Sequence, residues 1–158
     1  MDLDIGRSPV ARVTVASAIR VRPATLADAE PLSRLASELG YDVTAPEIKT
    51  HLVGLPLADE LLVASLGDRL VGWIQLSVSE SLVHHTHVQI VGLVVSRLWR
   101  GKGIGRRLMR DAEMWARARG ATTILLRATN QREEARRFYQ ALGYRELGTQ
   151  KVFVRELE

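Results

Sequence analysis

The chain has 158 residues, of which 46% are apolar and 25% charged, a composition that favours one globular domain and excludes a disordered chain. It contains no cysteine, which excludes disulfides and thiolate sites and favours a reducing, cytoplasmic setting. The net charge is +4, and six of the 22 basic residues fall between positions 97 and 110, so we expect one anionic ligand and no nucleic-acid partner.

The first segment of the chain is the least informative. Residues 1–17 have no clear pattern and are expected to form a loose tail or an added edge strand, followed by a single domain over residues 18–158. The segment starts acidic and Arg12 interrupts its apolar stretch, so it does not resemble a signal peptide. No apolar run approaches the roughly 18 residues that span a bilayer, and we expect no membrane partner.

The first half of the domain predicts three strands and two helices. The strands are expected at residues 19–25, 60–67 and 69–79, the last two joined by the hairpin signal Gly67-Asp68. The helices are expected at residues 25–40 and 44–55. Thr25 or Asp28 would cap the first helix, and Asp28 is favoured because it confines Pro31 to the first turn. Thr44 and Glu47 have the spacing of a capping box at the start of the second.

The second half predicts two further helices separated by a buried strand. An almost wholly apolar run at residues 87–96 is typical of a strand covered on both faces. The helices are expected at residues 104–120 and 130–143, the buried strand at 122–129, and two short closing strands over 144–157. Asn130 stands three residues before Glu133 and is a candidate N-cap. This order describes a mixed α/β sandwich with one strand-helix-strand crossover.

A glycine-rich turn, Gly101-x-Gly103-x-Gly105, joins the apolar strand to the following helix. The first turn of a helix has N–H groups without internal partners, and the helix dipole adds positive potential there, so such a turn is a ready anion site. Glycine lets a phosphate approach the backbone and permits a positive φ. The turn is not a P-loop, because Lys102 precedes the last glycine, and its spacing is not that of a dinucleotide fingerprint.

The turn does match Arg-x-x-Gly-x-Gly, as Arg100, Gly103 and Gly105, and so resembles the pyrophosphate loop of the GCN5-related N-acetyltransferase (GNAT) superfamily. The stretch "NQREEARRFYQALGY" resembles the second signature of the same family, an asparagine followed by a helix with Ala-x-x-Phe-Tyr that ends in Leu-Gly-Tyr. The resemblance covers residues 19–157 and is tight over 87–144. It implies an α/β fold of the α+β mixed-sheet type: a mostly antiparallel twisted sheet of about seven strands, with a splayed fourth and fifth strand pair, and four helices.

The resemblance also implies which residues bind acetyl-CoA. Backbone N–H groups from Gly101 to Arg106 would cradle the diphosphate, and three residues of the apolar strand would pair with the pantetheine arm beside a bulge at Gly92. The complete implied set is Leu93, Val94, Val95, Arg100, Gly101, Lys102, Gly103, Ile104, Gly105, Arg106 and Asn130. The alternatives are a plain helix-entry turn, and an Asn130 that only caps its helix.

Tyr139, from the Phe-Tyr pair, is the implied general acid, because a phenol near the sulfur can protonate the departing thiolate. The alternative is a core tyrosine on a helical stripe. The general base departs from the family pattern: Gln89 stands where many relatives carry glutamate, and an amide can position a water but cannot usefully accept a proton. Three upstream histidines could act instead or be merely solvated: His84, His85 and His87. His85 and His87 have no evident third ligand, so we expect no metal.

Together these features predict an acetyl-CoA-dependent N-acetyltransferase that acetylates a small-molecule or peptide primary amine by direct attack in a ternary complex. By family habit it would be a homodimer. The alternative is a catalytically weak or inactive GNAT-fold protein that binds or senses acyl-CoA. Residues 38–44 and 80–85 are expected to shape the acceptor site. There Glu38, Asp42 and Glu80 either favour a cationic amine, such as an aminoglycoside or polyamine, or are solvated surface charges.

Overall fold

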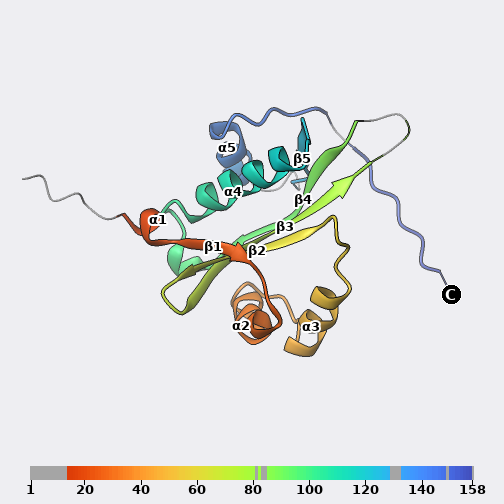
Figure 1. Ribbon diagram of the computed structural model, residues 1–158. Helices are drawn as coiled ribbons and strands as arrows, with labels where there is room; N and C mark the ends of the chain where they lie inside the picture. The colour runs from red at the N-terminus through yellow and green to blue at the C-terminus, as the bar shows by residue number, and fades with distance from the viewer. Residues whose placement is uncertain (1–13, 81, 83–84, 129–132, 149, 158) are drawn as a thin grey trace, which may run out of the picture. The chain divides into compact units, whose positions relative to one another are not determined.

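The computed structural model describes residues 14–80, 82, 85–128, 133–148 and 150–157 (Figure 1). The chain divides after Leu126 into two compact units. The first contains a five-stranded sheet with helices on both faces, and the second contains one helix, α5 (Glu133–Ala141). Among the described residues there is no helix with both the length and the hydropathy of a membrane span.

The sheet of the first unit contains its strands in chain order. They are β1 (Arg20–Pro23), β2 (Glu60–Leu66), β3 (Arg69–Ser79), β4 (His87–Val95) and β5 (Ile124–Leu126). Neighbouring strands are antiparallel except β4 and β5, which are parallel because the chain crosses over between them through a helix. β2 and β3 form the hairpin predicted at Gly67, whose φ of +58° suits a tight turn.

Helices cover both faces of this sheet (Figure 1). On one face lie α2 (Ala29–Glu38) and α3 (Ala45–Val53), and on the other lies α4 (Ile104–Ala118). The remaining helical segments are α1 (Val15–Ala18) and two 3-10 turns, Leu26–Asp28 and Arg97–Trp99. The capping box predicted for α3 is present, since the Thr44 N–H donates to Glu47 Oε2 at 2.7 Å.

The hydrophobic core lies on both sides of β2 and β3. The cluster beneath α2 consists of Leu32, Leu61, Val63 and Leu70. Beneath α4 the largest buried side chains are Ile74, Leu76, Val88, Ile104, Leu108 and Met109. Gly72 lies where β3 approaches both β4 and α4, because a Cβ there would be 2.7 Å from the Val94 carbonyl oxygen and 3.2 Å from Leu108 Cδ1. A residue with a Cβ would therefore push β3 away from β4 and α4 at this point.

The number of elements differs from the prediction. The described residues form five strands and five α-helices, so the expected seven strands and four helices are wrong in number. Part of the difference is α1, which forms because Thr14 caps a single turn. The two strands expected over 144–157 do not form in the described part of that segment. A strand requires ladder hydrogen bonds to a neighbour, and apolar alternation alone does not supply one.

An ion pair ties β1 to the start of α2. The two carboxylate oxygens of Asp28 accept hydrogen bonds from Arg22 at 2.7 and 2.8 Å, and one also accepts from the Thr25 N–H at 2.7 Å. Of the two predicted caps, Thr25 is the N-cap of the 3-10 turn and Asp28 is the N-cap of α2. The Asp28 side chain accepts from Thr25 and Arg22, however, and makes no cap hydrogen bond to α2. The Arg22 guanidinium lowers the pKa of Asp28 below its ordinary value of 3.8.

Asp28→Asn is expected to lower the free energy of unfolding by about 2 kcal/mol at neutral pH, because charge-assisted hydrogen bonds are lost at a buried carboxyl. Since the folded-state pKa is lowered, this contribution is present above the ordinary value of 3.8 and disappears as the pH falls through the folded value. Urea unfolding should show the stability gap between the native protein and the variant narrowing from neutral pH to about pH 2. A gap of the same size at both extremes would contradict this account.

Candidate active site

The edge of β4 that faces β5 is open over most of its length. β4 pairs with β3 from end to end, but with β5 only over residues 88–90. Val91 is an extra residue at the point where the register with β3 shifts, so β4 has a bulge one residue before Gly92, the position predicted for it. Beyond the bulge, Leu93, Val94 and Val95 pair with β3 on one side of β4. On the side toward β5 their backbone has no ladder partner among the described strands. Such an edge can pair with an extended ligand that carries amides.

The loop after β4 exposes a set of backbone donors. Gly101 and Gly103 have φ values of +72° and +84°, which side chains other than glycine rarely adopt. Gly103 is the N-cap of α4, and its carbonyl accepts from the Arg107 N–H at 3.0 Å. The N–H groups of residues 104–106 therefore precede the first hydrogen bond of the helix, where the helix dipole adds positive potential. This arrangement can hold a diphosphate.

Three exposed cationic side chains flank this loop: Arg100, Lys102 and Arg106. Arg100 Nε donates to the Val95 carbonyl oxygen at 3.3 Å and so links the loop to the end of β4. Arg107, by contrast, pairs with Asp111 at 2.7 Å along α4. The open strand edge, the backbone donors and the three flanking cations are thus contiguous in the first unit.

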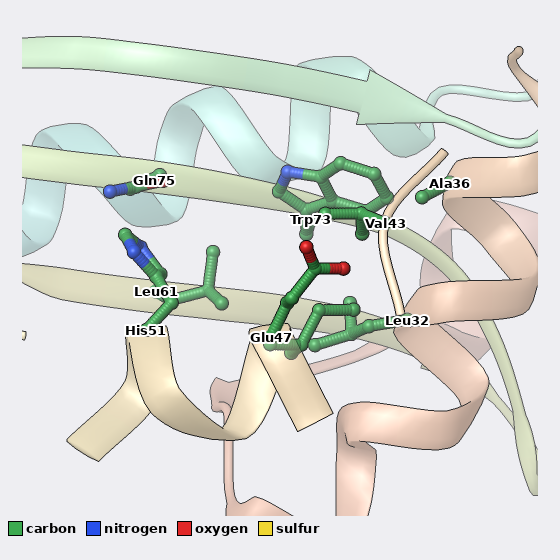
Figure 2. Close-up of a pocket in the computed structure, with 9 residues that line it drawn as sticks. Leu32, Ala36, Val43, Glu47, His51, Leu61, Trp73 and Gln75 are labelled. Carbon is green, nitrogen blue, oxygen red and sulfur yellow. The ribbon is translucent and has the colours of Figure 1, made fainter. Parts of the chain in front are cut away.

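A pocket of about 240 Å³ lies between α2, α3 and the sheet (Figure 2). Its polar residues are Glu47, His51 and Gln75, and its apolar residues are Leu32, Ala36, Val43, Ile48, Leu61 and Trp73. Figure 2 shows the Glu47 carboxylate beneath the Trp73 ring and the His51 imidazole at the end where Gln75 lies. The sequence reasoning missed this pocket, although Glu47 and His51 are one helical turn apart and Trp73 and Gln75 alternate along one strand.

The polar residues expected around the acceptor are distributed over the first unit. Glu38 accepts a hydrogen bond from the Ser96 hydroxyl at 3.1 Å, at the end of β4, whereas Asp42 is exposed. Gln89 pairs with Ser77, two residues along β3 from Gln75, and so lies on the same face of the sheet as the pocket. Gln89, which stands at the position where many relatives carry the general base, therefore lies on the face of the sheet that α2 and α3 cover.

The remaining candidates lie on the segment that leads into β4. Glu80 accepts from the Thr86 hydroxyl at 3.4 Å. His85 is exposed, His87 Nδ1 is 3.3 Å from the His85 carbonyl oxygen, and His84 lies outside the described residues. Within the described ranges there is no group of three or more His, Cys, Asp or Glu side chains that could hold a metal ion.

In the second unit, α5 carries the predicted general acid. The ring of Tyr139 is half-buried and meets Phe138 and Tyr144 edge-on, with centroid distances of 5.1 and 6.1 Å. Burial raises the pKa of the Tyr139 phenol above its ordinary value of 10.0, so the hydroxyl keeps its proton at neutral pH. Asn130 lies outside the described residues.

Solved structures similar to this chain include a transcriptional regulator from Bacillus halodurans C-125, 28% identical with a TM-score of 0.72, covering 85% of this chain and 99% of that chain. Another is an aminoglycoside acetyltransferase, meta-AAC0020, from an uncultured soil metagenomic sample, in complex with sisomicin. It is 17% identical with a TM-score of 0.77, and the match covers 91% of this chain and 99% of that chain. AAC(6')-Iy, in complex with the bisubstrate analog CoA-S-monomethyl-acetylneamine, is 16% identical with a TM-score of 0.75, and the match covers 88% of this chain and 98% of that chain. A comparison with curated proteins found no match.

The two acetyltransferases are less than 25% identical to this chain, so their likeness shows the fold alone. The family assignment comes from a sequence profile described as "Acetyltransferase (GNAT) family", which matches residues 32–144. That span is more than two thirds of the chain and includes the glycine loop, the open edge of β4 and Tyr139. The chain therefore belongs to the GNAT family of acetyltransferases.

Proposed function

We propose that the protein is an N-acetyltransferase that moves the acetyl group of acetyl-CoA to a primary amine by direct attack in a ternary complex. The observation that carries the proposal is the loop at the start of α4. There two glycines with positive φ precede three backbone N–H groups without helical partners, flanked by Arg100, Lys102 and Arg106. The homodimer implied by the family resemblance, and the cytoplasmic location favoured by the absence of cysteine, belong to the same proposal.

The residues present fit coenzyme A. Backbone donors from Gly101 to Arg106 would hold the diphosphate, and each charge-assisted hydrogen bond contributes about 1.5–3 kcal/mol. The backbone of Leu93, Val94 and Val95 would pair with the amides of the pantetheine arm along the open edge of β4. Asn130 would complete the set as a cofactor contact, as the family resemblance implies.

Acetyl-CoA, when bound, supplies a thioester whose carbon–sulfur bond breaks as the amine attacks. Tyr139 holds the proton for the departing sulfur, and its raised pKa keeps that proton in place at neutral pH. Gln89 does not accept a proton, but its amide can orient a water that carries away the proton of the amine. The amide at this position also favours a second candidate function, an acyl-CoA-binding or sensor protein with weak or no turnover.

Calorimetric titration with acetyl-CoA, followed by thiol-release assays with a panel of amines, tests the proposal. We expect acetyl-CoA to bind and pantetheine, which lacks the diphosphate, to bind far more weakly, because the loop would contact only the former. We also expect one or more amines to release free thiol. Binding without release for every amine would favour the sensor function, and the absence of heat with acetyl-CoA would refute both.

A further inference from the structure

The pocket between α2, α3 and the sheet, which the residues of the coenzyme A proposal do not use, is mostly apolar and contains one carboxylate. Figure 2 shows His51 and Gln75 toward one end, Trp73, Val43 and Ala36 toward the other, and the Glu47 carboxylate beneath the Trp73 ring. Six of its nine lining residues are apolar, so most of an occupant would be in contact with hydrocarbon and the indole ring. Hydroxyl groups of a ligand that lie against these apolar residues would be left without hydrogen-bond partners.

The Glu47 carboxylate gives the pocket a negative charge that can meet a cation. Glu47 Oε2 accepts hydrogen bonds from the Thr44 N–H and hydroxyl at 2.7 and 2.6 Å. Glu47 is exposed, and Figure 2 shows its carboxylate beneath the Trp73 ring. The same bonds from Thr44 lower the pKa of Glu47, so the group is ionised at neutral pH. A single carboxylate beside an indole face suits a single ammonium group.

The Glu47 carboxylate also lies near the open edge of β4. Trp73, whose ring lies above the carboxylate, is paired directly with Val94, and neighbouring strands are about 4.8 Å apart. An amine nitrogen beside Trp73 is therefore about one strand away from the backbone proposed to hold the pantetheine arm. The pocket volume of about 240 Å³ is below the roughly 300 Å³ at which pockets for drug-sized ligands begin, so the part of an occupant that it encloses is compact.

From this geometry we infer that the pocket takes the acceptor, and that the acceptor is a primary amine on a compact apolar body with one positive charge. The inference rests on the proposed acetyl transfer and narrows its substrate class. The ammonium meets Glu47 beneath the Trp73 ring, and the apolar body contacts the neighbouring Val43 and Leu32. Aminoglycosides and polyamines do not match this pocket, because their hydroxyl groups or further charges would lie against the apolar wall.

The test compares 2-phenylethylamine with tobramycin and spermidine as acceptors, measuring thiol release from acetyl-CoA. We expect kcat/KM for 2-phenylethylamine to exceed the other two by about 10-fold or more. Glu47→Gln keeps a residue suited to the capping box but removes the charge, so KM for 2-phenylethylamine should rise about 5-fold with kcat little changed. Glu30→Gln, an exposed acid in the first turn of α2 that does not line the pocket, is the matched control and should match the native enzyme.

A pocket-filling variant, Val43→Trp, should lose turnover of 2-phenylethylamine while its melting temperature and its affinity for acetyl-CoA stay near native values. Preference for tobramycin or spermidine, or unchanged turnover in Val43→Trp, would overturn the inference and leave the proposed function intact. If acetyl-CoA itself does not bind, the proposed function fails instead. Calorimetry with 2-phenylethylamine alone then decides the inference: binding that Val43→Trp abolishes supports the pocket as an amine site, and no binding overturns it.

Discussion

Gly103→Val is expected to abolish acetyl-CoA binding while the protein remains folded. Gly103 has a φ of +84°, a conformation that a β-branched side chain does not adopt without strain of about 1–3 kcal/mol. A Cβ there would also lie 3.2 Å from the Cβ of Ala16 in α1. The backbone must change to relieve both, and the N–H groups that follow Gly103 then turn away from a common point. The loss of two charge-assisted hydrogen bonds alone would weaken binding by about 100-fold or more.

Gly120→Val provides a matched control at the other end of the same helix. Gly120 follows the end of α4 with a φ of +75°, and a Cβ there would meet nothing within 4 Å. Both variants carry a similar backbone strain, so both should melt at a lower temperature than the native protein. Only Gly103→Val should lose affinity in calorimetric titration with acetyl-CoA. Native affinity in Gly103→Val, or an equal loss in Gly120→Val, would remove the loop from the binding site.

Most of the first unit could be predicted from local sequence because its elements depend on residues a few positions apart. The hairpin at Gly67, the capping box of Thr44 and the start of α4 at Ile104 were all predicted and are present. The glycine loop belongs to the same class, since the positive φ values and the unpaired N–H groups follow from its own residues. The loop that we propose binds the diphosphate could therefore be predicted from the sequence.

The pocket between α2, α3 and the sheet, which we propose takes the acceptor, was not predictable in the same way. It brings Leu32 from α2 together with Glu47 from α3 and Trp73 from β3, and no pattern within any one of these segments indicates the other two. Their meeting depends on how the helices cross the sheet, which is decided by packing rather than by periodicity. The early end of the β4–β5 pairing after Ile90 is a further long-range feature, which only the family resemblance anticipated as a splayed strand pair.

The closing strands show where alternation misleads. Val152, Phe153 and Val154 read as a strand, yet each is 88–90% exposed and their backbone is in no sheet of the described residues. Apolar residues indicate that a segment would gain from burial, but a strand also needs a neighbouring edge with which to exchange hydrogen bonds. Whether such an edge is present depends on the rest of the fold, and the sequence of the segment does not indicate it.

Tyr139→Phe is expected to lower kcat by about 100-fold with little effect on the affinity for acetyl-CoA, because it removes the proton donor and keeps the ring. The expected effect is near the low end for general acid catalysis, since a thiolate is a stable leaving group compared with an alkoxide. Burial raises the pKa of the phenol, so the acid form is present throughout the neutral range. The native enzyme should therefore show no loss of rate from Tyr139 ionisation until the pH exceeds about 10.

Tyr144→Phe is the matched control, because it removes the same hydroxyl from a ring whose centroid lies 6.1 Å from that of Tyr139. It should keep kcat within about 3-fold of the native value, which would assign the effect of Tyr139→Phe to its hydroxyl and not to a change in the aromatic cluster. Thiol release measures kcat, and calorimetry measures the affinity for acetyl-CoA in both variants. If Tyr139→Phe turns over at the native rate, the sulfur takes its proton from water and the Tyr139 ring only packs against the rings of Phe138 and Tyr144.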